Sequence, residues 1–180
     1  MQLVSRKWAA LLVLGAALTM AWLASAPSAD AATLKYHITA YESGQALELS
    51  PTGLVVEAAP NKSSLRQQWI KKSQAGGTAL YANASLPGSC LAVPSAATPT
   101  SFDNLTMRGC SATLDKRLHW TLHTGVPFNA GVRFHNAHTG QMVAPELCIV
   151  GPCSSQPSLL PGSFADSLGT FGEWRFKLLV

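Results

Sequence analysis

Charged residues are scarce in this chain, and their distribution excludes one large class of partners. They make up 12% of 180 residues, with 13 Lys and Arg against 9 Asp and Glu. After Ala31, the only adjacent basic pairs are Lys71-Lys72 and Lys116-Arg117. A nucleic-acid-binding protein normally carries a basic stripe, so we expect no nucleic-acid partner. The net charge of +4 fits a weak attraction to acidic surfaces, and ordinary solubility accounts for it as well.

The motifs of common hydrolases, metalloproteases and phosphate-binding enzymes are absent. The sequence has no Gly-x-Ser-x-Gly turn, no His-Glu-x-x-His and no glycine-rich loop that opens a helix. His135 and His138 have a spacing that suits two metal ligands, but no third ligand lies at short range. A surface turn is therefore the favoured interpretation of this pair. We expect a protein that is not an enzyme and that needs no cofactor or metal.

Only one long apolar run is present, and it lies near the start of the chain. It covers Trp8–Leu23, after the basic Arg6-Lys7 and before a run of small residues. This order is typical of a secretory signal peptide, and Ala29-x-Ala31 indicates cleavage near Ala31. An uncleaved anchor is the alternative, but the run is shorter than the roughly 20 residues that span a bilayer. We predict a secreted protein, extracellular or periplasmic, without a membrane span in its mature part.

The mature part is expected to form one domain. The signal peptide covers residues 1–31 and the domain covers residues 32–180, which is enough chain to bury a core. Loss of Arg6, Lys7 and Asp30 lowers the formal net charge from +4 to +3.

Cysteine is also infrequent, with four residues, Cys90, Cys110, Cys148 and Cys153. An even number in an exported chain indicates two disulfides. Three pairings are open, and Cys90–Cys110 with Cys148–Cys153 needs the least chain organisation. A metal site is the rival interpretation, but Cys148 and Cys153 have no nearby His pair, and Cys90 and Cys110 are far apart in sequence.

Helical patterns are missing after Ala32, where no segment sustains a 3.6-residue apolar period with caps. Short apolar or alternating runs recur instead at Leu34–Tyr41, Leu54–Ala58, Thr78–Tyr81, Leu118–Leu122, Val132–Phe134 and Glu173–Leu178. Gly, Pro, Ser and Asn separate these runs, which is typical of strands joined by turns. We predict an all-β barrel or sandwich without β-α-β units.

Three stretches of the chain begin alike and end alike. Each begins with an apolar strand and a polar turn that ends in glycine, at Gly44, Gly88 and Gly140. Each ends at one of the three tryptophans of the mature part, Trp69, Trp120 and Trp174, which follow one another at nearly equal intervals. We predict three equivalent units that share one core, in which burying each indole contributes about 2–3 kcal/mol. An irregular sandwich with three unrelated tryptophans is the alternative.

These motifs resemble the ricin-type β-trefoil family, whose repeats carry Gln-x-Trp and Ser-Gly-x-Cys-Leu. The resemblance covers Lys35 to Leu178 and rests on Gln67-x-Trp69, Ser43-Gly44-x-Ala46-Leu47 and Gly88-Ser89-Cys90-Leu91. It implies an all-β fold, a β-trefoil of three pseudo-threefold, four-stranded repeats. It also implies a Cys90–Cys110 disulfide in the second unit, with Cys148–Cys153 as a local variant in the third.

The resemblance further implies a site for galactose-like sugars, built from an acid, an aromatic ring and an amide. The first unit offers Glu48, Asn61 and Gln67 but no aromatic residue between Leu49 and Gln68. The second has Ala92 in place of the acid, followed by Phe102, Asp103 and Asn104, and the third has Ala144, with Phe164 as a distant aromatic candidate. If one site survives, we expect it in the first unit. For Gln67 itself, a structural hydrogen bond within the repeat is the favoured role and sugar binding is the alternative.

Two functions follow from this resemblance. The first is binding to a glycan or a host cell-surface receptor, and the chain also resembles the binding subunits of cytolethal distending toxins, which carry a separate nuclease subunit. The second is protease inhibition, because another secreted trefoil family of similar size inhibits proteases. Three glycosylation sequons, at Asn61, Asn83 and Asn104, matter only in a eukaryotic secretory pathway.

Overall fold

The computed structural model describes residues 33–111, 114–124, 131–145, 156–165 and 172–179. The predicted signal peptide and the predicted Cys148–Cys153 disulfide lie outside these residues. Within them the chain is all-β, with thirteen strands in one hydrogen-bonded network. The strands are β1 (Lys35–Ala40), β2 (Ala46–Leu49), β3 (Val55–Ala58), β4 (Gln68–Ser73), β5 (Ala79–Asn83), β6 (Leu86–Ala92), β7 (Asp103–Asn104), β8 (Thr106–Gly109), β9 (Trp120–Thr124), β10 (Val132–Asn136), β11 (Met142–Ala144), β12 (Ser158–Leu160) and β13 (Glu173–Leu179).

Helical structure among the described residues is confined to short pieces. They are three 3₁₀ turns, η2 (Leu65–Gln67), η3 (Ala75–Gly77) and η4 (Lys116–Leu118), and the helix α1 (Gly162–Ala165). The predicted strand at Leu118–Leu122 starts later than expected, because η4 holds Leu118 and the strand begins at Trp120. No helix in the described part of the chain is long and apolar enough to cross a membrane.

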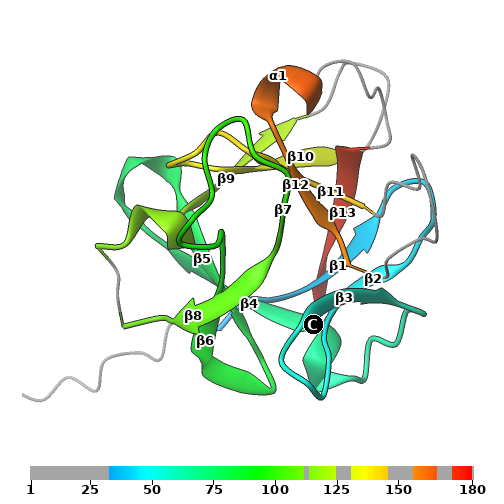
Figure 1. Ribbon diagram of the computed structural model, residues 1–180. Coiled ribbons are helices and arrows are strands. Elements are labelled where there is room, and N and C mark those ends of the chain that lie inside the picture. The colour runs from blue at the N-terminus through cyan, green and yellow to red at the C-terminus, as the bar shows by residue number, and fades with distance from the viewer. Residues whose placement is uncertain (1–32, 112–113, 125–130, 146–155, 166–171, 180) are drawn as a thin grey trace, which may run out of the picture. The chain divides into compact units, whose positions relative to one another are not determined.

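Six strands close into a ring (Figure 1). The antiparallel pairs run β1–β4, β4–β5, β5–β9, β9–β10, β10–β13 and back from β13 to β1. A closed ring leaves none of these strands with an unpaired edge, which removes a template for aggregation. Four antiparallel pairs of described strands lie outside the ring, namely β2–β3, β6–β8, β11–β12 and β7–β12.

The three tryptophans make the same hydrogen bond in three places. Each indole is at most 1% exposed. Each Nε1 donates to a backbone carbonyl in the second strand of its stretch: Trp69 to Leu47 at 2.9 Å, Trp120 to Leu91 at 2.9 Å and Trp174 to Val143 at 2.7 Å. A buried indole N–H needs such a partner, so one side chain both fills the core and ties a strand outside the ring to the ring itself.

The residue before each tryptophan is also used in the same way. Its carbonyl accepts from a backbone N–H just after the first strand of a neighbouring stretch: Ala84 to Gln68 at 2.9 Å, Ala137 to His119 at 2.8 Å and Tyr41 to Glu173 at 2.9 Å. The last of these bonds links β13 to the first stretch of the domain. Both sets of hydrogen bonds place the tryptophans in matching surroundings.

The predicted turn glycines have the same conformation in the first and third stretches, but the glycine of the second stretch differs. Gly44 and Gly140 have φ of 69° and 71°, a conformation that favours glycine. Gly88 instead lies inside β6, because the second stretch turns earlier. Asn83 forms that turn, and its Oδ1 accepts from the Ser85 amide at 3.0 Å and the Ser85 hydroxyl at 2.6 Å.

Aromatic rings fill the inside of the barrel. Tyr81, Phe134 and Phe176 come from β5, β10 and β13, and their ring centroids are 5.1 to 5.7 Å apart in edge-on arrangements. Each such pair adds about 0.5–1.5 kcal/mol to the gain from burial. The core therefore holds together strands that are far apart in sequence.

Candidate functional site

Gln67, the first-unit amide predicted from the Gln-x-Trp motif, is buried and fully hydrogen-bonded. Its Nε2 donates to Glu48 Oε2 at 2.6 Å and to the Ala59 carbonyl at 2.9 Å. Its Oε1 accepts from the Asn61 backbone N–H at 2.6 Å and contacts His37 Nε2 at 3.1 Å. The amide has two donor and two acceptor positions, so all of them are occupied by the protein.

Glu48 and Asn61 lie beside Gln67, but Asn61 joins the network only through its backbone. Its side-chain Oδ1 accepts from the Ser63 N–H at 3.1 Å, which is a local turn contact. No aromatic side chain from Thr33 to Gln67 is exposed. The structure thus brings the three predicted first-unit residues together without an exposed ring on which a sugar could stack.

The second-unit candidate Phe102 has an aromatic partner from a distant part of the sequence. Phe102 is 62% exposed and Phe164 is 38% exposed. Their ring centroids are 6.0 Å apart with an interplanar angle of 73°. The two rings meet because β7 pairs with β12, with Asn104 opposite Ser158, and α1 follows β12 directly.

A hydrogen-bonded pair of amides joins the two segments that carry these rings. Asn104 Nδ2 donates to Gln156 Oε1 at 2.8 Å, and Asn104 is exposed. Phe102 directly precedes β7 and Asn104 ends it, so the exposed ring and the exposed amide are two residues apart in the chain. We call Phe102, Asn104, Gln156 and Phe164 the aromatic patch.

Asp103, between the two exposed residues, is turned toward the protein. Its Oδ2 accepts from Ser101 Oγ and from Gln141 Nε2, the latter at 3.2 Å. Gln141 is fully buried and also donates to the Ser101 carbonyl at 2.9 Å. Asp103 therefore anchors the strand that carries Asn104 and follows Phe102.

Some residues of this region were not identified from the sequence. Gln141, Gln156 and Ser101 carry no motif, and only the pairing of β7 with β12 brings Gln156 to Asn104. Phe164 was a distant candidate of the third unit, and the structure places it beside a second-unit residue. The sequence holds only a weak signal that these residues lie together, because paired strands from different units share no local motif.

The remaining predicted positions are buried or pack against neighbouring side chains. Ala92 and Ala144, which stand where the family has an acid, are fully buried. Asn83 is also fully buried, and its Nδ2 donates to the Arg66 carbonyl at 2.8 Å. The His135 ring packs edge-on against His123 at 4.8 Å, and within the residues that the structure covers no three His, Cys, Asp or Glu form a group that could hold a metal.

The Cys90–Cys110 disulfide predicted from the resemblance is present, with Cα atoms 5.1 Å apart. It joins β6 to the residue that follows β8. The other two cysteines fall in residues 146–155, which are not described.

Comparison with known proteins identifies the fold. No family profile and no curated protein sequence matches the chain. Among solved structures, the designed threefold-symmetric protein ThreeFoil superposes with a TM-score of 0.65 at 20% identity, over 81% of this chain and 99% of that one. The Macrolepiota procera ricin B-like lectin in complex with lactose gives a TM-score of 0.61 at 19% identity, over 79% and 94%.

A mosquitocidal holotoxin gives a TM-score of 0.66 at 15% identity, over 83% of this chain but only 18% of the toxin. At these identities the similarity concerns the fold. The chain has the β-trefoil fold.

Proposed function

We propose that this protein is secreted and binds carbohydrate without catalysing a reaction, and that the aromatic patch is its binding surface. The observation that carries the proposal is the pair of exposed rings, Phe102 and Phe164, beside the hydrogen-bonded amides of Asn104 and Gln156. Exposed aromatic rings that gather on a surface are a common feature of binding sites.

The chemistry of the patch suits a sugar. The C–H face of a pyranose packs on an aromatic ring, and its hydroxyls both donate and accept, as do amides. Because Asn104 is exposed, the second N–H of its amide can be directed at a sugar hydroxyl. The lactose complex of the structurally similar lectin makes β-galactosides the first ligands to test.

The patch differs from the site that we expected in the first unit. There, every hydrogen-bonding position of Gln67 is used inside the protein, and Glu48 already accepts one of its bonds. A sugar would have to displace internal bonds of the fold, which are costly to leave unmade. We therefore place the binding surface on the aromatic patch, which joins second-unit residues to third-unit residues.

A glycan array with the folded mature protein tests the proposal, followed by titration of the best ligand. Phe102→Ala is expected to weaken binding at least about tenfold, because an aromatic anchor typically contributes about 2 kcal/mol or more. Leu54→Ala is the matched control, since Leu54 is 50% exposed and lies between β2 and β3 rather than on the patch. A folded protein that binds no glycan, or equal losses in both variants, would contradict the proposal.

A narrower proposal is that the protein delivers a toxin, as the binding subunit of a cytolethal-distending type of assembly. The resemblance in sequence and the presence of this fold inside a mosquitocidal holotoxin support it. The test is co-purification of the protein with the products of its neighbouring genes. A stable complex with a nuclease-like product is expected, and the absence of such a gene would count against delivery but not against sugar binding.

A further inference from the structure

Basic side chains from both ends of the domain gather on the outer side of β1 and β13, which Figure 1 shows side by side. Directly opposed residues of an antiparallel pair point to the same side of the sheet, and Lys177 lies opposite His37. Arg175 is two residues before Lys177 and Lys35 is two residues before His37, so they share that side. The alternate residues, such as Ile38, point into the core.

A turn of the first stretch brings a further lysine to this side. Gln68 lies opposite His37 across the β1–β4 pair, and its Nε2 donates to the Lys62 carbonyl at 2.9 Å. A side-chain contact with Lys177, together with the repulsion between the two charges, lowers the pKa of Lys62. The two ammonium groups therefore repel each other, and an anion placed between them would remove that repulsion. We call this set the basic face: Lys35, Lys62, Arg175 and Lys177.

The basic face has no acidic partner among the residues that the structure describes. The salt bridges of these residues involve one acid, Asp115, which lies in the second stretch. Glu173 shares the outer side of β13, but it is fully buried and lies opposite Arg133 on β10. Apart from Lys35, which is partly buried, the members of the basic face are exposed. Unneutralised cations that gather on a surface attract anionic partners.

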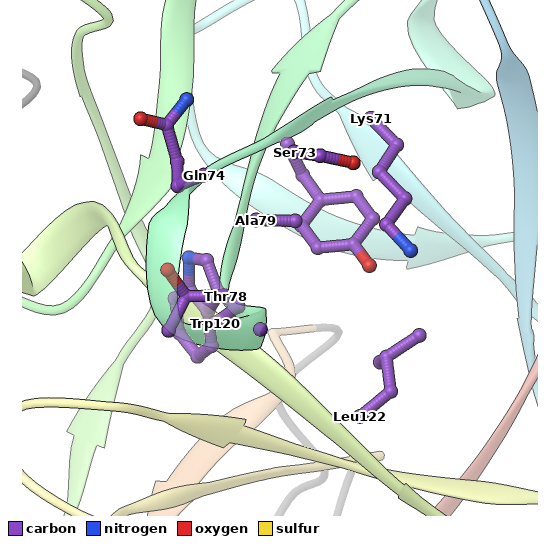
Figure 2. A pocket seen from close by; sticks show the side chains of 9 residues that line it. Lys71, Ser73, Gln74, Thr78, Ala79, Trp120 and Leu122 are labelled. Carbon is purple, nitrogen blue, oxygen red and sulfur yellow. The ribbon is translucent and has the colours of Figure 1, made fainter.

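The neighbouring Lys71 does not belong to the basic face. It lies opposite Tyr81 in the β4–β5 pair and on the same side of β4 as the core residue Trp69. Figure 2 shows Lys71 beside a pocket that Ser73 and Leu122 also line. The charges of the basic face therefore come from the outer side of the sheet, whereas Lys71 points to the inner side.

The surroundings of the basic face favour a glycan over a nucleic acid. Single strands are held by bases that stack on aromatic rings. Tyr41 is the ring beside this face, but the Arg175 guanidinium lies over it, 4.2 Å from its centroid. A duplex is read by an element that enters a groove of about 12 Å, and the side of a closed six-stranded barrel is too broad to do so.

The spacing of the cations suits a chain that carries repeated negative charges. Residues two apart on a strand are separated by about 7 Å, and residues on adjacent strands by about 5 Å. Sulfate groups on successive sugars of a polysaccharide recur on the same scale. Each sulfate also presents several oxygens, which an ammonium with three N–H donors can share with a second ammonium.

We propose that the basic face binds a sulfated glycan, with one sulfate group between Lys62 Nζ and Lys177 Nζ and further sulfates beside Lys35 and Arg175. The basic face shares no residue with the aromatic patch, so either proposal can fail without the other. It adds acidic glycans to the neutral sugars that suit the patch.

Titration calorimetry of residues 32–180 with a chondroitin sulfate hexasaccharide at low salt tests the site. The unsulfated chondroitin hexasaccharide is the control, because it has the same backbone and the same carboxylates. We expect the sulfated form to bind at least about tenfold more tightly, since hydrogen bonds to charged groups are the strong ones. The affinity should fall as salt is added, and a DNA duplex should bind more weakly at the same salt.

Two variants assign the sulfate contact. Lys62→Met and Lys177→Met should each weaken binding of the sulfated hexasaccharide about tenfold. Because both lysines hold the same sulfate group, the double variant should lose less than the product of the two single losses. Lys116→Met is the matched control, since Lys116 is exposed and lies in η4, outside β1 and β13. It and Phe102→Ala should leave the affinity unchanged.

Three results would overturn the proposal. The first is equal affinity of the folded protein for the sulfated and the unsulfated hexasaccharide. The second is a DNA duplex that binds as tightly as the sulfated hexasaccharide, which would make this a nucleic-acid surface. The third is that Lys62→Met and Lys177→Met, with thermal unfolding like that of the parent, bind as well as Lys116→Met.

Discussion

At the scale of single residues, Gln67 illustrates how a motif residue takes its role from its neighbours. The Gln-x-Trp motif identified the residue and left two roles open, of which a structural hydrogen bond was favoured over sugar binding. The contacts with Glu48, Ala59, Asn61 and His37 use every position of the amide. Such contacts depend on three segments that fold together, so no local pattern could have chosen between the roles.

Gln67→Ala is therefore expected to lower the free energy of unfolding by about 2 kcal/mol or more, since it leaves several buried groups unpaired. Urea denaturation measures this change. Gln68→Ala is the control, because the Gln68 side chain makes one exposed contact, with the Lys62 carbonyl at 2.9 Å, and should cost less than about 1 kcal/mol. An equal loss of unfolding free energy in the two variants would show that the buried hydrogen bonds of Gln67 stabilise the fold no more than one exposed contact does.

Asp115 provides a prediction about acid. Its Oδ1 and Oδ2 accept from Arg117 Nε and Nη2 at 2.8 Å each, and Oδ1 also accepts from the Arg117 backbone N–H at 3.1 Å. The Arg117 side chain, with smaller contributions from its backbone N–H and from Arg108, holds the pKa of this carboxyl below its usual value. A lowered pKa adds stability above the carboxyl's ordinary pKa, and this stability is lost as the pH falls through the lowered value.

Asp115→Asn should thus unfold at a lower temperature than the parent at neutral pH, and the gap should close in strong acid. Asn retains the capping ability of Asp, so the comparison isolates the charge. Because the pair lies at the surface, the difference is expected to be small, a few degrees at most. Thermal unfolding followed by circular dichroism measures this difference. A difference in unfolding temperature that does not change with pH would contradict a lowered pKa for Asp115.

At the scale of elements, the sequence predicted strands well and pairs of strands poorly. The run at Leu34–Tyr41 became β1 and the run at Glu173–Leu178 became β13, because apolar alternation depends only on neighbours in the chain. The pairing of β7 with β12 joins segments that are far apart in sequence. It was not predicted, and it is the pairing that builds the aromatic patch.

The pair β6–β8 carries the disulfide, and its removal gives a prediction for this element. Cys90 and Cys110 are 20 residues apart, and a crosslink of this loop length stabilises a fold by about 3 kcal/mol. The double variant Cys90→Ala, Cys110→Ala should lose roughly that amount in urea denaturation. An unchanged free energy of unfolding would mean that the β6–β8 register, with Cys90 opposite Arg108, already fixes the loop without help from the crosslink.

At the scale of the whole molecule, the fold could be predicted from the sequence because a large core side chain recurs in each of the three stretches. The indoles of Trp69, Trp120 and Trp174 each donate a hydrogen bond to a backbone carbonyl in the second strand of their own stretch. A repeat of this sort is visible in sequence because the core demands the same large side chain each time. Binding residues face solvent, where the core makes no such demand, and they therefore vary from unit to unit.

The most direct measurement of the central claim is chemical-shift mapping of residues 32–180 with the glycan that binds best. Sugar binding at the aromatic patch predicts that the perturbed amides gather at Phe102, Asn104, Gln156 and Phe164. Glu48, Asn61 and Gln67 should remain unperturbed. Perturbations centred on those three first-unit residues, or none at saturating glycan, would contradict the account.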